Sequence, residues 1–146
     1  MQDLKQNTKI VKSVTAQTLT AAANGTAADL QGFNSAFISV SVGASGDTLS
    51  ASVKWDYVIE HSDDNSTFTA VTSNTEVTGG TEDSSGLFTT VDAAAEDDAV
   101  YGIGYVGGKR YVRVAVAKTG THTNGTPHAA VIIVGHPLHG PTADQT

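Results

Sequence analysis

The sequence predicts an all-β domain, a jelly roll or β-sandwich of about eight or nine short antiparallel strands. Three observations favour this class. No segment of a dozen residues keeps an apolar stripe with the helical period of 3.6. Several segments alternate apolar and polar residues with a period of two, as half-buried strands do. Threonine and glycine, which disfavour helix interiors, are dense along the whole chain.

Five segments carry the strongest strand signal. Four of them alternate and are expected to present one buried and one solvated face, and the fifth is apolar on both faces and is expected to be a central strand. The four alternating segments are Val53 to His61, Ala36 to Val42, Arg110 to Lys118 and Val100 to Val106. The segment that is apolar on both faces is Ala129 to Val134.

Four weaker segments complete the expected set of about nine strands. They are Lys9 to Thr15, Ala27 to Gln31, Phe68 to Ser73 and Leu87 to Val91. Short strands at fairly even spacing, separated by turn signals, are typical of sandwiches and jelly rolls.

The connections contain turn-forming residues. Gly107-Gly108 predicts a two-residue primed turn between two strands, because such turns require positive φ. Ser62 to Ser66 (SDDNS) predicts a turn held by Asp and Asn side chains. Asp92 to Asp98 is expected to be a loop, since an isolated helical turn is marginal in water. Gly43 to Leu49 and Gly79 to Gly86 are expected to be longer loops, mobile or bound to a partner.

A chain of 146 residues fits one domain with a core of its own. We expect a single β domain over 1–146, with an N-terminal arm at 1–9, a sandwich core at 10–136 and a C-terminal arm at 137–146. Both arms are polar or proline-containing and have little to bury. Residues 1–9 also lack the apolar run of a secretory signal.

The composition disfavours two classes of partner. A formal net charge of −7 argues against nucleic acid, whose phosphates bind clustered Lys and Arg. The one basic cluster, Lys109, Arg110 and Arg113, lies on an alternating strand that cannot turn all three to one face. No membrane partner is expected, because the longest apolar run is far too short to span a bilayer. There is no cysteine, so disulfides and thiolate metal sites are excluded.

The sequence predicts no enzyme, no cofactor and no metal site. It contains no GxSxG, HExxH or phosphate-binding glycine motif. The histidines, such as His122 and His128, are expected at the surface or at an interface, since none sits in a ligand pattern. The acidic clusters Asp63 to Asn65 and Glu96 to Asp98 lack the spacing of a calcium loop.

Parity separates the aromatic residues. Trp55 and Tyr57 share the apolar side of their strand and are expected in the core, although aromatic rings could instead form a sugar-binding platform. Phe37 and Tyr111 fall on the more polar side of their strands. We therefore expect both to be exposed anchors at a protein interface.

Four segments resemble the capsid cement or decoration proteins of tailed bacteriophages, including the Bordetella-phage cement type. They are Gly25 to Val42 (GTAADLQGFNSAFISVSV), Ile59 to Val71 (IEHSDDNSTFTAV), Gly104 to Val116 (GYVGGKRYVRVAV) and Val131 to Pro141. The resemblance spans residues 10 to 141, except for 83–99, which match no part of that family.

The resemblance implies a jelly-roll or sandwich module on the outer surface of an icosahedral capsid, assembled in the bacterial cytoplasm. Such a module forms dimers or trimers and bridges major capsid protein subunits. Residues 1–12 and 135–146, which include the two arms, would then make contacts between subunits. The expected interface residues, which include the two exposed aromatics, are Leu4, Lys5, Ile10, Phe37, Tyr111, His136, Leu138 and His139.

Three alternatives stay open from the sequence. The chain could be a glycan-binding module of a head fibre or adhesion protein, which predicts Trp55 or two tyrosines exposed in a groove. It could be another virion structural piece of the tail or neck, present in few copies. It could also be a hydrolase on a β scaffold, which predicts Ser, His or carboxylate side chains gathered in one pocket.

Overall fold

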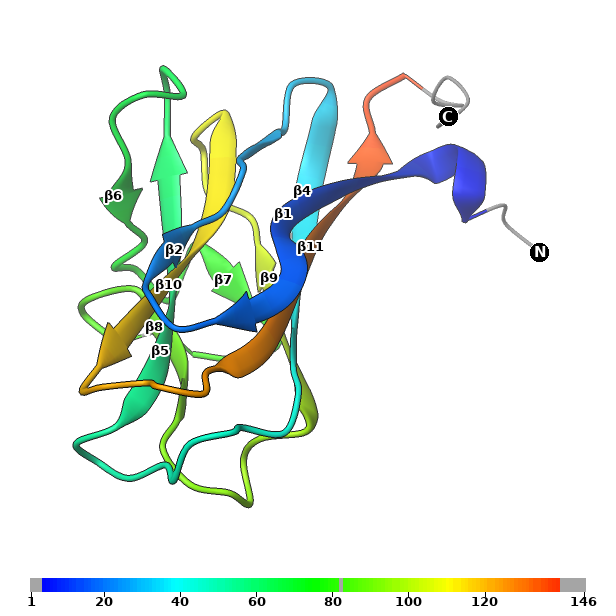
Figure 1. Ribbon diagram of the computed structural model, residues 1–146. Helices are drawn as coiled ribbons and strands as arrows, with labels where there is room; N and C mark the ends of the chain where they lie inside the picture. The colour runs from blue at the N-terminus through cyan, green and yellow to red at the C-terminus, as the bar shows by residue number, and fades with distance from the viewer. Residues whose placement is uncertain (1–3, 82, 140–146) are drawn as a thin grey trace.

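The computed structural model describes residues 4–81 and 83–139 and confirms the all-β prediction. Eleven strands in this part of the chain form two antiparallel sheets, which pack face to face as a sandwich (Figure 1). Two two-residue strands, β2 and β7, account for the excess over the expected eight or nine. One short 3-10 helix, η1 (Lys5–Asn7), precedes the first strand.

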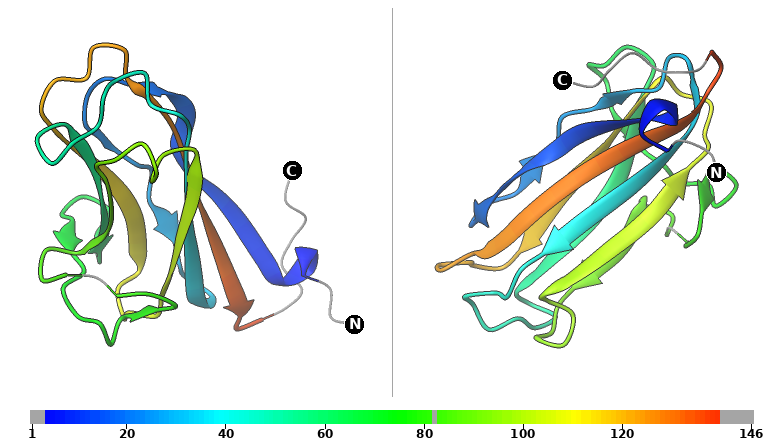
Figure 2. Two further views of the ribbon diagram at one scale, coloured as in Figure 1. Left: turned by 90° about the horizontal axis from the view of Figure 1, so that it is seen from below. Right: turned by 90° about the vertical axis from the view of Figure 1, so that its right-hand side faces the viewer.

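The first sheet has the strand order β1-β11-β4-β9-β7, seen face-on in the right view of Figure 2. Its strands are β1 (Thr8–Leu19), β11 (Thr126–Pro137), β4 (Phe33–Val42), β9 (Ala99–Tyr105) and β7 (Val77–Thr78). The apolar strand β11 is an inner strand, as its composition predicts.

The second sheet has the order β2-β10-β5-β6, with β3 also pairing β10 and β8 also pairing β5. Its strands are β2 (Ala23–Asn24), β10 (Tyr111–Thr119), β5 (Lys54–Ser62), β6 (Thr69–Ala70), β3 (Ala28–Asp29) and β8 (Leu87–Val91). Along the chain the strands cross repeatedly between the two sheets: β2 and β3 in the second sheet lie between β1 and β4 of the first, and β9, β10 and β11 alternate. This is the connectivity of a double-sheet jelly roll.

The core lies between the sheets and follows the predicted parity. Trp55 and Tyr57 on β5 are fully buried, as are Ile38 on β4 and Ile132 on β11. Trp55 is 0% exposed, and its Nε1 donates a hydrogen bond to Thr126 Oγ1 at 3.0 Å. A buried indole needs such a partner for its N–H group.

The turn prediction for Gly107-Gly108 is wrong. These glycines lie between β9 and β10, which belong to different sheets, so the segment crosses the sandwich and does not close a hairpin. Neither glycine has positive φ; at the β10–β11 connection, Gly120 and Gly125 do. At Gly125, with φ of 77°, a Cβ would lie 2.6 Å from the carbonyl oxygen of Leu19, so only glycine fits there.

The turn prediction for Ser62 to Ser66 is confirmed. β5 and β6 pair antiparallel across it, and Asp64 Oδ1 accepts hydrogen bonds from the backbone N–H groups of Ser66 and Thr67. Asn65 takes the left-handed conformation, with φ of 58°. These hydrogen bonds hold the pKa of Asp64 far below its usual value.

The strands at the two ends of the chain reach further than expected. β1 begins at Thr8 and β11 ends at Pro137, and Thr8 pairs with Gly135. Thr8 and Lys9, expected in the N-terminal arm, therefore belong to the strand that forms one edge of the first sheet. The parts of the predicted arms at 1–3 and 140–146 lie outside the described residues.

Candidate functional site

The candidate site is the outer face of the first sheet, meaning the side turned away from the second sheet. Strand register places Ile10 opposite Ile133, Ile133 opposite Phe37, and Phe37 opposite Gly104. These four positions form one row across β1, β11, β4 and β9. Because directly paired residues point to the same face, the row is a continuous apolar strip.

The strip is open to solvent along much of its length. Phe37 is 47% exposed and Ile10 is 64% exposed, whereas Ile38 and Ile132, on the inner face of β4 and β11, are buried. Gly102, on the neighbouring strand, makes room for the phenyl ring, since a Cβ there would lie 2.5 Å from Cζ of Phe37. The ring therefore rests on the glycine backbone and still presents a free face.

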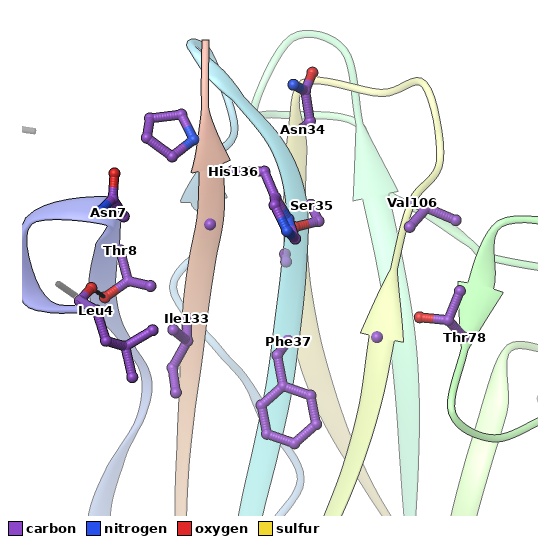
Figure 3. Close-up of a pocket in the computed structure, with 14 residues that line it drawn as sticks. Leu4, Asn7, Thr8, Asn34, Ser35, Phe37, Thr78, Val106, Ile133 and His136 are labelled. Carbon is purple, nitrogen blue, oxygen red and sulfur yellow. Dashed lines mark hydrogen bonds between the residues drawn. The ribbon is translucent and has the colours of Figure 1, made fainter. Parts of the chain in front are cut away.

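The strip leads into a groove of about 990 Å³ at the end of the sheet where β11 finishes (Figure 3). Leu4, Phe37 and Ile133 contribute apolar side chains to it, and Ser35 and His136 contribute polar ones. None of the side chains that line the groove is Asp, Glu, Lys or Arg. An uncharged groove of this kind suits contact with another uncharged or apolar surface.

His136 is held in an unusual conformation at this groove. Its φ is 54°, which is uncommon for a residue other than glycine. Its Nδ1 lies 2.7 Å from Ser35 Oγ, the distance of a hydrogen bond. The pairing aims the imidazole across β4 and into the groove.

Large exposed apolar side chains concentrate around this face. Six are exposed in the described part of the chain; five lie on strands of the first sheet or directly flank them, Leu4 precedes η1, and none lies on the second sheet. They are Leu4, Ile10, Phe37, Val100, Val106 and Leu138. Contiguous exposed apolar surface marks interaction sites more often than scattered single residues do.

The outer face of the second sheet has the opposite character. Lys54 pairs with Asp56 at 3.0 Å, and Arg113 pairs with Glu60 at 2.7 Å while its guanidinium stacks on an aromatic ring. The predicted basic cluster is likewise neutralised, because Arg110 meets Asp29 at 2.7 Å. Charges that already pair with one another gain little from burial against a partner.

The predicted interface residues separate into two groups. Leu4, Phe37 and His136 line the groove, Ile10 extends its strip, and Lys5 lies exposed in η1 beside them; Leu138 and His139 are exposed just beyond β11.

Tyr111 does not join this group. It is partly buried on β10, in the second sheet, and Arg110 packs over its ring at 5.0 Å. The sandwich places Phe37 and Tyr111 in opposite sheets, so they cannot form one patch. Tyr111 is therefore less exposed than its parity suggested, and it lies apart from the groove.

The sequence reasoning missed part of the site. Ala129 to Val134 was expected to be a central strand, but no expectation was formed for its outer face, where Val131 and Ile133 are only half-buried. In a two-layer fold, a strand has one face on the core and one face outward. An apolar run on both sides of such a strand is thus itself a signal of an uncovered face.

The prediction that the histidines lie at the surface is wrong for His61, His122 and His128, which are buried. Two of them pack on Trp55, with ring centroids 4.2 Å away for His122 and 4.6 Å away for His128. His128 Nδ1 lies 2.7 Å from the Tyr57 hydroxyl, while its Nε2 has no hydrogen-bond partner among the described residues. Burial lowers the pKa of His128 to about 4.

The loop from Gly43 to Leu49 is tied to the sandwich. Asp47 accepts hydrogen bonds from the backbone N–H groups of Thr123, Asn124 and Gly125, at 3.2, 3.0 and 2.7 Å. These bonds lower the pKa of Asp47. The loop therefore braces the β10–β11 connection beneath the buried histidines.

No protein-family model, no curated protein and no solved structure matches this chain. Within residues 4–81 and 83–139, no group of three or more His, Asp or Glu side chains is placed to hold a metal ion, and no helix is long and apolar enough to cross a membrane.

Proposed function

We propose that the chain is a virion structural protein that decorates and stabilises the outside of an icosahedral phage capsid by bridging major capsid protein subunits. One observation carries the binding role: the exposed large apolar side chains gather on and around the first sheet in a protein of net charge −7. The capsid as partner is drawn from the resemblance in the sequence.

The outer face has the composition of an interface core. Such cores are depleted in charge and enriched in aromatic residues that act as anchors. Phe37 is the central aromatic here, and small residues surround it, including Ser39 and Gly102. Small neighbours let a partner approach the ring closely and exclude water around it.

The proposed mechanism is linkage. A protein that binds the assembled shell, and not its separate subunits, stabilises the shell by its own binding free energy. Each contact can be modest, because many copies and several contacts per oligomer add through effective concentration. Dimers or trimers of the chain belong to this proposal and would use surfaces outside the groove.

The glycan-binding alternative loses its expected platform. Trp55, Tyr57 and Tyr105 are fully buried, so these rings are not available to stack on a sugar. Tyr101 is partly buried and donates its hydroxyl hydrogen to the carbonyl of Glu96. The groove beside Phe37 offers one exposed ring where a platform needs a row.

One feature would favour the hydrolase alternative, namely the hydrogen-bonded pair of Ser35 and His136 in the groove. A catalytic serine needs its histidine oriented by a third group, and donors that stabilise the oxyanion. Among the described residues, none of the carboxylates pairs with His136. A hydrolase would lose its activity in a Ser35→Ala variant, whereas the decoration proposal predicts no hydrolytic activity in either the wild type or the variant.

The test is incorporation into particles encoded by the same genome. The chain should be present in a copy number comparable to that of the major capsid protein, and Phe37→Asp should be largely absent from purified particles. Ala117→Asp, at an exposed position on the second sheet, is the matched control and should be incorporated normally. A wild-type content of about a dozen copies or fewer would contradict decoration and favour a tail or neck role.

A further inference from the structure

One charged side chain stands on the otherwise uncharged outer face. Lys12 pairs with Val131 in the row next to the one formed by Ile10, Ile133 and Phe37. Across the paired, outward-facing positions of β1, β11, β4 and β9, it is the one Lys, Arg, Asp or Glu that the structure describes. It is exposed and lies at the sheet edge, within reach of whatever covers the strip.

The surrounding chain is basic as well. Residues 4–28 contain Lys5, Lys9 and Lys12 and no acidic residue, in a protein with 15 acidic and 8 basic residues overall. Lys9 points the other way, toward the second sheet, where its charge helps lower the pKa of Asp29. Lys12 thus gives the outer face of the first sheet a positive charge, whereas the net charge of the whole chain is −7.

This charge pattern argues against a second copy of the chain as the occupant. Two copies packed face to face around a two-fold axis present the same residues to each other. Each copy would bring a Lys12 ammonium to the contact and neither would bring a carboxylate from this face. Burying an unpaired ammonium is costly, so such a contact would be disfavoured.

We propose that the outer face binds a different protein whose contact surface combines an apolar ridge with a carboxylate. The ridge packs along the row of Ile10, Ile133 and Phe37, and the carboxylate pairs with Lys12. This inference rests on the proposed function and names the chemistry of the capsid surface that the chain would bind. The ammonium sets the register of the ridge on the strip and speeds encounter with an acidic surface.

The experiment adds purified protein back to particles assembled without it from the genome that encodes it. Binding is measured for the wild type, Lys12→Gln, Lys12→Glu and Phe37→Asp, with Lys118→Glu as the control. Lys118 is also exposed but lies near the end of β10, away from the strip. Thermal unfolding of each free variant verifies that the sandwich is intact.

We expect Lys12→Glu to weaken binding by about tenfold or more, because a like-charge contact replaces an ion pair. Lys12→Gln should fall between it and the wild type, and Lys118→Glu should stay within about twofold of the wild type. Added salt should weaken binding of the wild type more than that of Lys12→Gln.

The outcomes separate the two proposals. Failure of the wild type to bind the particles would overturn the proposed function, and this inference with it. Wild-type binding that Lys12→Glu leaves unchanged would overturn this inference alone. Sedimentation of the free protein adds a further check, because a dimer that Phe37→Asp converts to a monomer would show that a second copy occupies the face.

Discussion

Acid should destabilise this fold through a buried histidine. His128 is 3% exposed, lies between the sheets against Trp55, and pairs through Nδ1 with Tyr57. Its other ring nitrogen has no hydrogen-bond partner among the described residues. Protonation would therefore place a cation in the core with no described carboxylate paired to it.

The magnitude follows from the two protonation equilibria. The imidazole takes up a proton near pH 6.5 in the unfolded chain, but the pKa of His128 in the fold is about 4. Between these values the unfolded state binds more protons, so the free energy of unfolding falls as the pH falls. The stability fully present above pH 6.5 should drop by about 3 kcal/mol once the pH is below 4.

The assay is urea unfolding between pH 7.5 and 4.5, followed by fluorescence of Trp55, the sole tryptophan and a direct neighbour of His128. Asp47 and Asp64 have lowered pKa values in the fold, so the stability that they contribute when ionised is lost as they take up protons at more acidic pH. Staying above pH 4.5 avoids most of this loss. His61 also has a pKa lowered by burial, so part of the decline remains without His128.

The decisive comparison is with His128→Gln, which cannot take up the proton. This variant should be less stable at pH 7.5, because the packing on Trp55 changes, but its stability should decline less on acidification. The exposed His139 supplies the control, and His139→Gln should decline as the wild type does. A decline in His128→Gln as steep as that of the wild type would refute the reasoning.

Three further predictions concern the scaffold. Gly102→Ala should displace the Phe37 ring, because the added Cβ would collide with Cζ of that ring. It should weaken particle binding while changing the free energy of unfolding by less than about 1 kcal/mol. A loss of stability without a loss of binding would contradict this. Trp55→Phe should cost about 2 kcal/mol in urea unfolding, since it leaves a cavity and removes the hydrogen bond to Thr126, and a neutral effect would speak against the described packing. Asp47→Ala should lower the melting temperature and accelerate amide exchange at residues 123–125, which lose their acceptor, whereas unchanged exchange would show that the loop does not brace them.

Period-two patterning was enough to predict the core of β5 and the exposure of Phe37. Parity along a strand decides which residues share a face, and one face of each sheet lies on the core. The same argument put Tyr111 on the outward side of β10, but it did not show that Arg110, its neighbour in the sequence, packs over the ring and leaves it only partly exposed. It also gave no sign that Ile133 faces outward, since an apolar run does not reveal whether a second layer covers the strand.

Other features depend on contacts distant in sequence. Gly107-Gly108 is short enough for a hairpin, but loop length does not determine which sheet the next strand joins. His122 and His128 are buried because both pack on Trp55 in the folded core, and no local signal marks those contacts. The groove likewise arises where Leu4 meets Ile133 and Phe37, three residues brought together by the order of the strands.

The central claim is that the outer face of the first sheet is covered by another protein when the chain is in its working assembly. Carbene footprinting of free and particle-bound protein measures this directly, since it labels exposed side chains. Ile10, Phe37 and Val100 should lose most of their labelling on binding, while Arg113 and Glu60 on the second sheet should keep theirs. Protection of the second sheet, with Phe37 labelled equally in both states, would contradict the account.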